Sequence, residues 1–519
     1  MIQPSEIDLN EGFLKALDKA ENSDSHVLIT GRAGTGKSTF LSYFRQNTKK
    51  KIAVLSPTGV AAVNVKGQTI HSFFGFRPDI TIHNVEQIKP KNPSFYKKID
   101  AIVIDEISMV RADLIDCVDV FLRKYGPKKN RPFGGIQTIL IGDLYQLPPV
   151  VTSKEKVIFE ELYRTPYFFS SRVFEECEFE FIEFERVYRQ SDPVFVDVLN
   201  GIRNNTISED LIKLLNSRYI PDFVPNEDEF YIYLVTTNKM AENINSDRLS
   251  KIRHKEFKYY GYLEGEFKES DLPTSAQLNL KVDAQVMLLN NDSKGRWING
   301  DIGKILEIQP SKSEPDVIIV ELKNGEVVEV VPYTWEMFEF FYDKKKKKIS
   351  TEVVGQFTQY PLKLAWAITI HKSQGLTFDK VILDLGKGTF SHGQLYVALS
   401  RCRSFDGLIL KRPVKREHIL LDRKIVQFLT RFQYSLAEKK LPLEEKISFI
   451  EKCIEREKLL EIVYLKSSDI KTKRIIKPLF IGKMEFNGRN FLGLKAFCMM
   501  RREERNFNVE KIIEIREVD

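Results

Sequence analysis

The sequence predicts an α/β fold with two α/β domains of similar size. From residue 26 to about 151, short runs of Val, Ile and Leu alternate with helix-like or loop segments, which is typical of buried parallel strands. A second series of such runs lies between residues 231 and 383. The first apolar run leads directly into a glycine-rich loop and a helix-like stretch. With 519 residues, the chain is long enough for several cores.

The first series predicts four strands and one interruption. The strands are expected at 27–29, 52–55, 101–104 and 138–141. Three prolines between Gly75 and Pro93 favour a small insertion there rather than another core element.

The second series predicts strands at 231–235, 284–289 and 381–383, and a different texture from Trp297 to about Tyr360. Asn324-Gly325 between β-branched runs is a strong hairpin signal and favours a small all-β insertion. The lysine run 344–348 falls within this insertion. Its pattern leaves three interpretations open: a solvated loop, a phosphate-contacting tip or a nuclear localisation signal.

The last part of the chain has a third pattern of residue types. After Arg431 the sequence becomes charged and helical, and from Leu459 onward short β-like runs return at 462–464, 480–481 and 491–492. This change predicts a separate C-terminal domain.

Composition excludes some classes and leaves others open. Lys and Arg number 79 against 72 Asp and Glu, a net charge of +7 that permits a basic face without requiring one. Five scattered cysteines without a C-x-x-C pair suggest no disulfide framework, zinc site or iron-sulfur site. The N-terminus has no signal-peptide character and no apolar run is long enough for a membrane span. We expect a soluble, cytoplasmic protein that does not bind membranes.

The octapeptide Gly31–Ser38 fits the P-loop pattern G-x-x-x-x-G-K-[ST]. Its glycines let backbone N–H groups point at phosphates, and the helix that follows adds partial positive charge. Lys37 would reach the β- and γ-phosphates, and the Ser38 hydroxyl would ligate magnesium. A chance match is disfavoured by the strand before the loop and the helix after it. The loop predicts a nucleoside triphosphatase.

Two later segments supply partners for such a loop. The run 102–104 ends in Asp105-Glu106, where Asp105 would hold the metal and Glu106 would orient or deprotonate water. An ordinary strand exit is the alternative for this pair. Gln146, after the run 139–141, would lie near the γ-phosphate.

Two arginines outside the first domain are candidate arginine fingers. Arg189 stands in a Tyr-Arg-Gln tripeptide, and Arg401 ends the segment from Tyr396. Either would stabilise charge on the transferring phosphoryl group if the two domains face each other. Taken alone, each arginine is better explained as a surface salt-bridge partner, and only the ordered set of motifs favours the finger role.

Taken in order, these segments resemble the motifs of superfamily 1 helicases, most closely superfamily 1B DNA helicases of Pif type, which are related to RecD. The resemblance runs over roughly four fifths of the chain, which excludes accidental agreement. The matching segments are 31–39, 56–62, 69–74, 103–106, 142–149, 188–190, 371–377 and 396–401.

The resemblance implies two RecA-like domains with ATP and Mg²⁺ between them, single-stranded DNA across their tops, and 5′-to-3′ movement. By position, the catalytic residues would be Lys37, Asp105, Glu106, Gln146, Arg189 and Arg401, with Ser38 and Asp105 at the metal. Nucleotide contacts would come from Gly31, Ala33, Gly34, Thr35, Gly36, Lys37, Ser38, Thr39, Asn10 and Gly375. DNA contacts would come from Thr58, Gly59, His71, Ser72, Phe73, His371, Lys372, Ser373 and Gln374.

The resemblance also implies a domain plan with a wedge subdomain and an SH3-like barrel as insertions. The C-terminal segment resembles a WYL domain through residues such as Tyr464, Arg474 and Phe507, although Asn490 takes the usual tryptophan position. An accessory DNA-binding module and a mere structural buttress both remain open for it. The expected boundaries are 1–69 and 96–182 for the first RecA-like domain, 70–95 for the wedge, 183–296 and 361–428 for the second RecA-like domain, 297–360 for the barrel, 429–458 for a helical linker and 459–519 for the WYL-like domain.

Some assignments keep a structural alternative. The family usually carries a glutamine before the P-loop that reads adenine, and here Asn10 is the candidate substitute. Phe73 and its neighbouring phenylalanines would stack bases or form core, and His71 and His371 would contact DNA or serve structure.

The function expected is an ATP-dependent 5′-to-3′ DNA helicase that unwinds duplexes, with guanine quadruplexes as a further candidate substrate. Its expected partners are single-stranded DNA and single-strand/duplex junctions, and we expect a free monomer, nucleoid-associated if bacterial. The rival is a P-loop kinase or signalling ATPase without nucleic acid, which would need neither the 371–377 nor the 396–401 segment.

Overall fold

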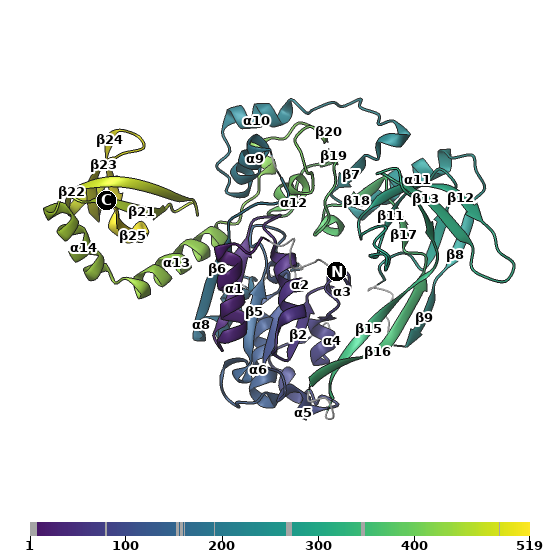
Figure 1. The fold of residues 1–519 in the computed structure, drawn as a ribbon, viewed down its shortest axis with the longest axis horizontal. Coiled ribbons are helices and arrows are strands. Elements are labelled where there is room, and N and C mark those ends of the chain that lie inside the picture. Colours follow the sequence, from purple (N-terminus) through teal and green to yellow (C-terminus); the bar gives the residue numbers. More distant parts are fainter. Residues whose placement is uncertain are drawn as a thin grey trace. The chain divides into compact units, whose positions relative to one another are not determined.

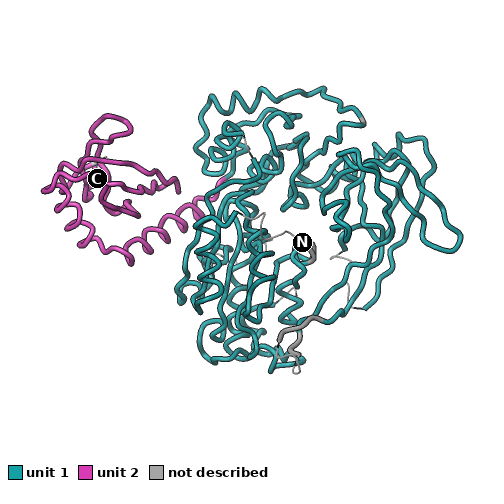
Figure 2. The backbone as a smooth tube through the Cα atoms, in the orientation of Figure 1, with its two compact units in different colours: residues 1–420 teal, residues 421–519 magenta. Residues whose placement is uncertain are grey.

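The computed structural model describes residues 8–77, 80–151, 155, 159, 161–190, 192–265, 272–343, 348–486 and 488–518. The chain divides into two compact units, Met1–Leu420 and Leu421–Asp519 (Figure 2). Within the described ranges, every helix is too short or too polar to cross a membrane. Residues 344–347 of the lysine run lie outside the described residues.

A six-stranded parallel sheet organises the first part of unit 1 (Figure 1). The four predicted strands are all present as β1 (His26–Gly31), β2 (Ile52–Ser56), β4 (Ala101–Ile104) and β5 (Gln137–Ile141). The strand order is β3-β2-β4-β5-β1-β6, with β3 at Gln68–Thr69 and β6 at Phe179–Phe184. β6 therefore continues past residue 182, where the first domain was expected to end. The helices of this part are α1 (Glu11–Asn22), α2 (Lys37–Asn47), α3 (Gly59–Asn64), α4 (Ile70–Phe74), α5 (Pro93–Tyr96), α6 (Ala112–Tyr125) and α8 (Arg172–Glu176).

This sheet is apolar on both faces because helices cover it. Val27 and Ile29 of β1 pack with Phe13 of α1 and with Phe40 and Phe44 of α2. The Phe13 and Phe40 rings meet edge to face at 5.4 Å. Burial of the strand that leads into the P-loop fixes the position of that loop relative to the sheet.

A second, four-stranded parallel sheet has the order β18-β7-β19-β20. Its strands are β7 (Ile232–Val235), β18 (Ala367–Thr369), β19 (Val381–Asp384) and β20 (Leu408–Leu410). Two of the three predicted strands of the second series, 231–235 and 381–383, correspond to β7 and β19. The accompanying helices are α9 (Pro193–Arg203), α10 (Glu209–Asn216), α11 (Asn238–Lys251) and α12 (Gln394–Ser400).

The third predicted strand of that series was assigned to the wrong sheet. Residues 285–288 form β11 (Gln285–Leu288), which belongs to a five-stranded antiparallel sheet of order β14-β13-β12-β11-β17. A short apolar run is equally compatible with a parallel and an antiparallel sheet, so its pattern could not decide between them. The remaining strands are β12 (Ile302–Gln309), β13 (Val317–Leu322), β14 (Val327–Val330) and β17 (Leu362–Leu364).

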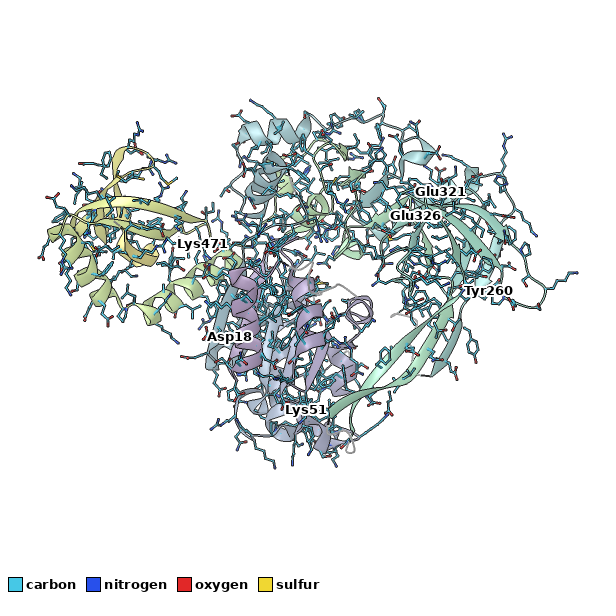
Figure 3. All side chains as sticks on the ribbon, in the orientation of Figure 1. Asp18, Lys51, Tyr260, Glu321, Glu326 and Lys471 are labelled. Carbon is cyan, nitrogen blue, oxygen red and sulfur yellow. The ribbon has the colours of Figure 1, made fainter. Side chains whose placement is uncertain are left out.

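The predicted hairpin joins β13 to β14. Gly325 has φ +83°, and its N–H donates to the Leu322 carbonyl over 2.8 Å. Glu321 and Glu326, on the two sides of this turn, lie close together in Figure 3. The β-rich insertion is larger than 297–360, because β8 (Phe257–Tyr260), β10 (Gln277–Leu280), β11 and β17 belong to the same region.

A long hairpin extends from this insertion toward the first sheet (Figure 1). It consists of β15 (Tyr333–Asp343) and β16 (Lys348–Gln359), and β9 (Tyr262–Gly265) pairs with β16. The ring of Phe340 on β15 meets that of Phe73 on α4 with centroids 5.9 Å apart.

The described residues of unit 2 form two α-helices, a short 3-10 helix (Val509–Lys511) and an antiparallel sheet of order β24-β23-β22-β21-β25. α14 (Leu443–Glu455) buries Ile450 and Cys453 against Leu460 and Leu494 of the sheet. Helix α13 (Arg423–Lys440) begins before the linker expected at 429, and unit 2 starts at Leu421. The strands are β21 (Leu459–Leu465), β22 (Lys471–Phe486), β23 (Arg489–Cys498), β24 (Glu503–Asn508) and β25 (Ile512–Val518).

Candidate functional site

The P-loop connects the end of β1 to the start of α2. Gly34 and Gly36 have φ +78° and +89°, a left-handed backbone that glycine adopts without steric cost. The Lys37 ammonium donates to the Gly31 and Arg32 carbonyls over 2.7 and 2.9 Å. Burial lowers the pKa of Lys37, and nearby carboxylates oppose that shift. A partly buried cation is thus held at the centre of the loop.

Asp105 and Glu106 follow β4 at the edge of the sheet where the P-loop also lies. The Asp105 N–H donates to the Leu55 carbonyl over 2.9 Å, and Glu106 has φ +52°. Burial raises the pKa of both carboxyl groups, and Lys37 opposes the shift. Two partly buried carboxyls beside a lysine need further positive charge to ionise fully.

The Asp105 carboxylate and the Ser38 hydroxyl could hold magnesium only together with the phosphates of a bound nucleotide. Mg²⁺ prefers oxygen ligands and is commonly held by one or two carboxylates plus substrate phosphates. Asp105 and the Ser38 hydroxyl provide such oxygens, whereas no group of three or more His, Cys, Asp or Glu side chains in the described ranges forms a metal site of its own.

A cavity of about 910 Å³ opens over the P-loop, large enough for a nucleoside triphosphate. Residues 33–39, Glu106 and Gln146 line it from the first domain. From the second domain come Gly375, Thr377, Arg401 and Arg403. The structure thus brings most of the predicted nucleotide residues to one inter-domain cavity.

Both candidate arginine fingers border this cavity. Arg189 lies over the P-loop so closely that a Cβ at Gly34 would be 2.5 Å from the Arg189 Cβ, and its Nη1 donates to the Ser400 carbonyl over 3.3 Å. Arg401 is 1% exposed, and its Nη1 donates to the carbonyls of Ser373 and Leu376 over 3.4 and 3.3 Å. Burial, followed by the Arg189 guanidinium, lowers the pKa of Arg401.

Asn10 does not line this cavity. Its Oδ1 accepts the Phe13 N–H over 3.0 Å as the N-cap of α1, and its Nδ2 donates to the Tyr188 hydroxyl over 2.8 Å. Asp8 and Tyr188 line the cavity instead, and the Tyr188 hydroxyl donates to Asp8 Oδ2 over 2.9 Å. The sequence indicated neither residue as a nucleotide contact: Asp8 lies just before the segment where the family glutamine is expected, and Tyr188 stood out only as the neighbour of Arg189.

The predicted DNA-contacting segments follow the carboxyl ends of parallel strands, where ligands of open α/β sheets bind. Thr58 follows β2, Ser72 lies in α4 after β3, and Lys372 follows β18; all three side chains are exposed. Ser373 differs, since its hydroxyl is buried and donates to the Ile370 carbonyl over 2.7 Å. We therefore retain the first three as candidates for side-chain contact with DNA and exclude Ser373.

Phe73 is a core residue in this structure, which corrects its place among the candidate DNA contacts. Its side chain is 6% exposed. The ring centroids of Phe74, Phe95, Tyr96 and Phe340 lie 4.7 to 6.0 Å from its own. With rings on several sides and little of its surface exposed, Phe73 is placed to pack in the core rather than to stack on a base.

Lys363, on β17, is a candidate that sequence analysis missed. Burial, followed by the neighbouring Lys372 cation, lowers the pKa of Lys363 to about 8. Two adjacent cations favour binding of an anion such as a phosphate. The signal was weak in the sequence, because an isolated lysine in a strand has many explanations.

Comparison with known proteins places this geometry in a family. The PIF1-like helicase model matches residues 9–210, and the UvrD-like helicase C-terminal domain matches residues 364–404. ATP-dependent DNA helicase Pif1 of Bdellovibrio bacteriovorus is 31% identical over 82% of this chain and 93% of its own length. The chain belongs to the Pif1 helicase family.

Solved Pif1 structures share the fold. Bacteroides sp Pif1 in complex with ADP-AlF4 aligns with TM-score 0.73 and 35% identity over 84% of this chain and 98% of that one. Pif1 helicase from Candida albicans aligns with TM-score 0.65 and 29% identity, covering 82% and 99%. The predicted α/β class with RecA-like domains is thereby confirmed, while the SH3-like and WYL-like assignments stay predictions.

Proposed function

We propose that this chain is an ATP-dependent DNA helicase that moves 5′ to 3′ along single-stranded DNA and unwinds the duplex ahead, with guanine quadruplexes as a further substrate. The observation that carries the proposal is the shared cavity, in which the P-loop faces Arg401 of the second domain. Arg401 is also hydrogen-bonded to the 373–376 segment, the candidate DNA side. One side chain therefore connects the nucleotide cavity with the DNA-facing turn.

Each cavity residue has a role that its chemistry supports. Lys37 and the loop N–H groups would hold the phosphates, and Ser38 and Asp105 would hold Mg²⁺. Bound ATP with Mg²⁺ supplies the phosphoryl group that is transferred to water. Glu106 would accept a proton from that water, Gln146 would orient it, and Arg189 and Arg401 would stabilise the developing charge.

DNA as the partner is supported by the relatives. Solved structures include Bacteroides Pif1 bound to ssDNA and two coordinating Pif1 helicases at forked dsDNA. For this chain we propose binding to single-stranded DNA and to single-strand/duplex junctions. We also propose that it is a monomer when free and is located in the cytoplasm, associated with the nucleoid if the cell is bacterial. Thr58, Ser72, His371 and Lys372 are the contacts we favour, with Gly59 and Gln374 beside them.

We further propose that 70–95 acts as the wedge, that the β-rich insertion is SH3-like, and that unit 2 is a WYL-like accessory DNA-binding module. The aromatic cluster of Phe73, Phe95 and Tyr96 supports a rigid wedge. The five-stranded sheets of the insertion and of unit 2 are consistent with small β modules.

The decisive experiment is unwinding of duplexes that carry either a 5′ or a 3′ single-stranded tail. We expect ATP-dependent unwinding of the 5′-tailed duplex and little of the 3′-tailed one. Equal rates on both substrates would contradict the polarity. ATP hydrolysis that does not rise when single-stranded DNA is added would favour a signalling ATPase.

A further inference from the structure

A buried chain of hydrogen bonds links the P-loop to the second domain. The Ala33 N–H donates to the Tyr396 hydroxyl oxygen over 2.9 Å, and that hydroxyl donates to Asp143 Oδ2 over 3.1 Å. Arg203 Nη2 lies 3.5 Å from Asp143 Oδ1. Tyr396, Asp143 and Arg203 are 3%, 0% and 4% exposed, so water does not replace these contacts easily.

The four groups come from both domains. Ala33 belongs to the P-loop, and Asp143 follows β5 of the same sheet. Tyr396 lies on α12 and Arg203 ends α9, both with the second domain. The Arg203 guanidinium also lies 3.9 Å above the Tyr145 ring. Each of the three contacts, Ala33–Tyr396, Tyr396–Asp143 and Asp143–Arg203, therefore crosses the domain boundary.

The Ala33 N–H is a single donor with two candidate acceptors. P-loop N–H groups point at phosphate oxygens when a nucleotide binds. In this structure the Tyr396 oxygen is the acceptor. Burial and Asp143 raise the pKa of Tyr396, which keeps the hydroxyl protonated, so that it accepts from Ala33 while donating to Asp143. A phosphate oxygen that accepts the hydrogen bond from the Ala33 N–H must therefore displace the Tyr396 hydroxyl.

Displacement of Tyr396 would also affect Arg401, because the same short helix carries both. α12 spans Gln394–Ser400 with Arg401 as its C-cap. The Arg401 guanidinium is turned toward the Ser373 and Leu376 carbonyls. A small rotation of α12 changes the position of both ends together, since helices move as rigid elements.

We propose that Tyr396 is a positioning residue that competes with the nucleotide for the Ala33 N–H. Phosphate binding would then release α12 and allow the Arg401 guanidinium, at the cavity wall, to turn from the Ser373 and Leu376 carbonyls toward the phosphates. Asp143 and Arg203 hold Tyr396 in the competing position. The inference rests on the proposed ATP-driven function, but its first test needs no DNA.

The test compares Tyr396→Phe with the parent chain in two measurements. Affinity for a fluorescent, non-hydrolysable ATP analogue is expected to rise, with a Kd about fivefold lower, because one competing hydrogen bond is gone. The kcat of DNA-stimulated ATP hydrolysis is expected to stay the same or to rise, because α12 no longer has to be released from Ala33 before Arg401 can turn. Unchanged or weaker nucleotide binding by the folded variant would overturn the proposal.

Tyr163→Phe is the matched control. Tyr163 is also a buried tyrosine whose hydroxyl donates to a buried carboxylate, Asp116 Oδ2, over 3.0 Å, but it does not line the cavity. Loss of the Tyr163 hydroxyl should lower the melting temperature about as much as loss of the Tyr396 hydroxyl does, but it should not tighten nucleotide binding. If both variants bind the analogue equally well, the effect of Tyr396→Phe is general loosening and the proposal fails.

A second variant covers the case in which Tyr396→Phe does not fold. Asp143→Asn keeps the side-chain shape but replaces the carboxylate with a neutral amide, which holds the Tyr396 hydroxyl less firmly. Nucleotide Kd should fall by about twofold, in the same direction, and a rise would contradict the proposal. Because these binding assays contain no DNA, they decide the inference even if the chain proves not to unwind DNA.

Discussion

The P-loop and the turn at 371–377 contrast in how their polar groups are satisfied. In the P-loop, Lys37 and the Ala33 N–H already have protein acceptors at hydrogen-bond distance. At the turn, Lys372 is exposed and lies near Lys363, whose pKa is lowered by burial and then by that neighbouring cation. Nucleotide binding at the P-loop therefore replaces protein hydrogen-bond acceptors with phosphate oxygens. DNA binding near the turn instead brings negative charge to the neighbouring cations of Lys363 and Lys372.

The difference predicts different responses to the same perturbation. An exchange of buried hydrogen bonds depends on geometry and little on salt, whereas charge neutralisation at an exposed site is strongly salt-dependent. Arg401 touches both regions, since it lines the cavity and donates to carbonyls of the turn. Substitution of this residue should therefore affect both.

The largest effect is expected for Arg401→Lys. A lysine cannot form the same set of donors, so DNA-stimulated ATP hydrolysis should fall by about 10³-fold in kcat. Arg416→Lys is the control, because Arg416 pairs with Glu209 on the surface of the second domain. Steady-state ATPase assays with single-stranded DNA measure the effect, and a loss smaller than about tenfold would remove Arg401 from the phosphate-stabilising role.

Glu106→Gln should have the next largest effect and should be confined to the nucleotide side. The amide keeps the shape of the carboxylate but cannot accept a proton, so kcat should fall by about 10²-fold or more. Binding of the ATP analogue and of single-stranded DNA should persist. Glu180→Gln, which removes a half-exposed partner of Lys19, should hydrolyse ATP normally. Normal turnover in Glu106→Gln would exclude Glu106 as the base.

Lys372→Gln should show the opposite pattern, with the effect confined to the DNA side. Loss of one phosphate contact should weaken single-stranded DNA binding by about tenfold at low salt and reduce the slope of log K against log salt by about one. Nucleotide affinity without DNA should not change. Fluorescence anisotropy titrations at several salt concentrations measure both values. Lys251→Gln on α11, whose lysine pairs with Asp247, is the control, and an unchanged slope for Lys372→Gln would contradict the contact.

The smallest effect is a pH dependence of DNA binding. The pKa of Lys363 is lowered to about 8, below its ordinary 10.5, so the free side chain loses its charge as pH rises through that value. A DNA phosphate favours the protonated form of Lys363, so the affinity for DNA should decline about threefold between pH 7 and 9. Lys372 is the charged group that faces Lys363, and the pKa of His371 is lowered, so this histidine stays neutral over the window. Lys363→Gln should make the profile flat, and equal affinity of the parent chain at both pH values would exclude this titration.

Local pattern predicted the first domain well. Continuous apolar runs identified β1, β2, β4 and β5 because strands buried on both faces leave a strong signal. The P-loop was recognisable because its glycines and Lys37 act through nearby backbone, within eight residues of sequence.

The sequence did not predict features that depend on which distant segment packs against a residue, such as the sheet that a strand joins or the burial of a side chain. Residues 285–288 lie in a short, mostly apolar run, as β7 does, but joined the antiparallel sheet. Phe73 stands in a motif of the DNA side but is covered by Phe340, which lies far along the chain on another insertion. Both outcomes were set by long-range packing that no local window contains.

The sequence by itself determined the α/β class, the chemistry of the P-loop and the family of the chain, because each depends on short ordered patterns of residue type. Only the tertiary structure decided which partners those residues meet. Tyr396 contacts Ala33, which lies 363 positions earlier in the chain. Arg401, at the end of the same helix α12, contacts the turn at 373–376. Such contacts depend on the relative placement of two folded domains, and that placement arises from the packing of many side chains at once.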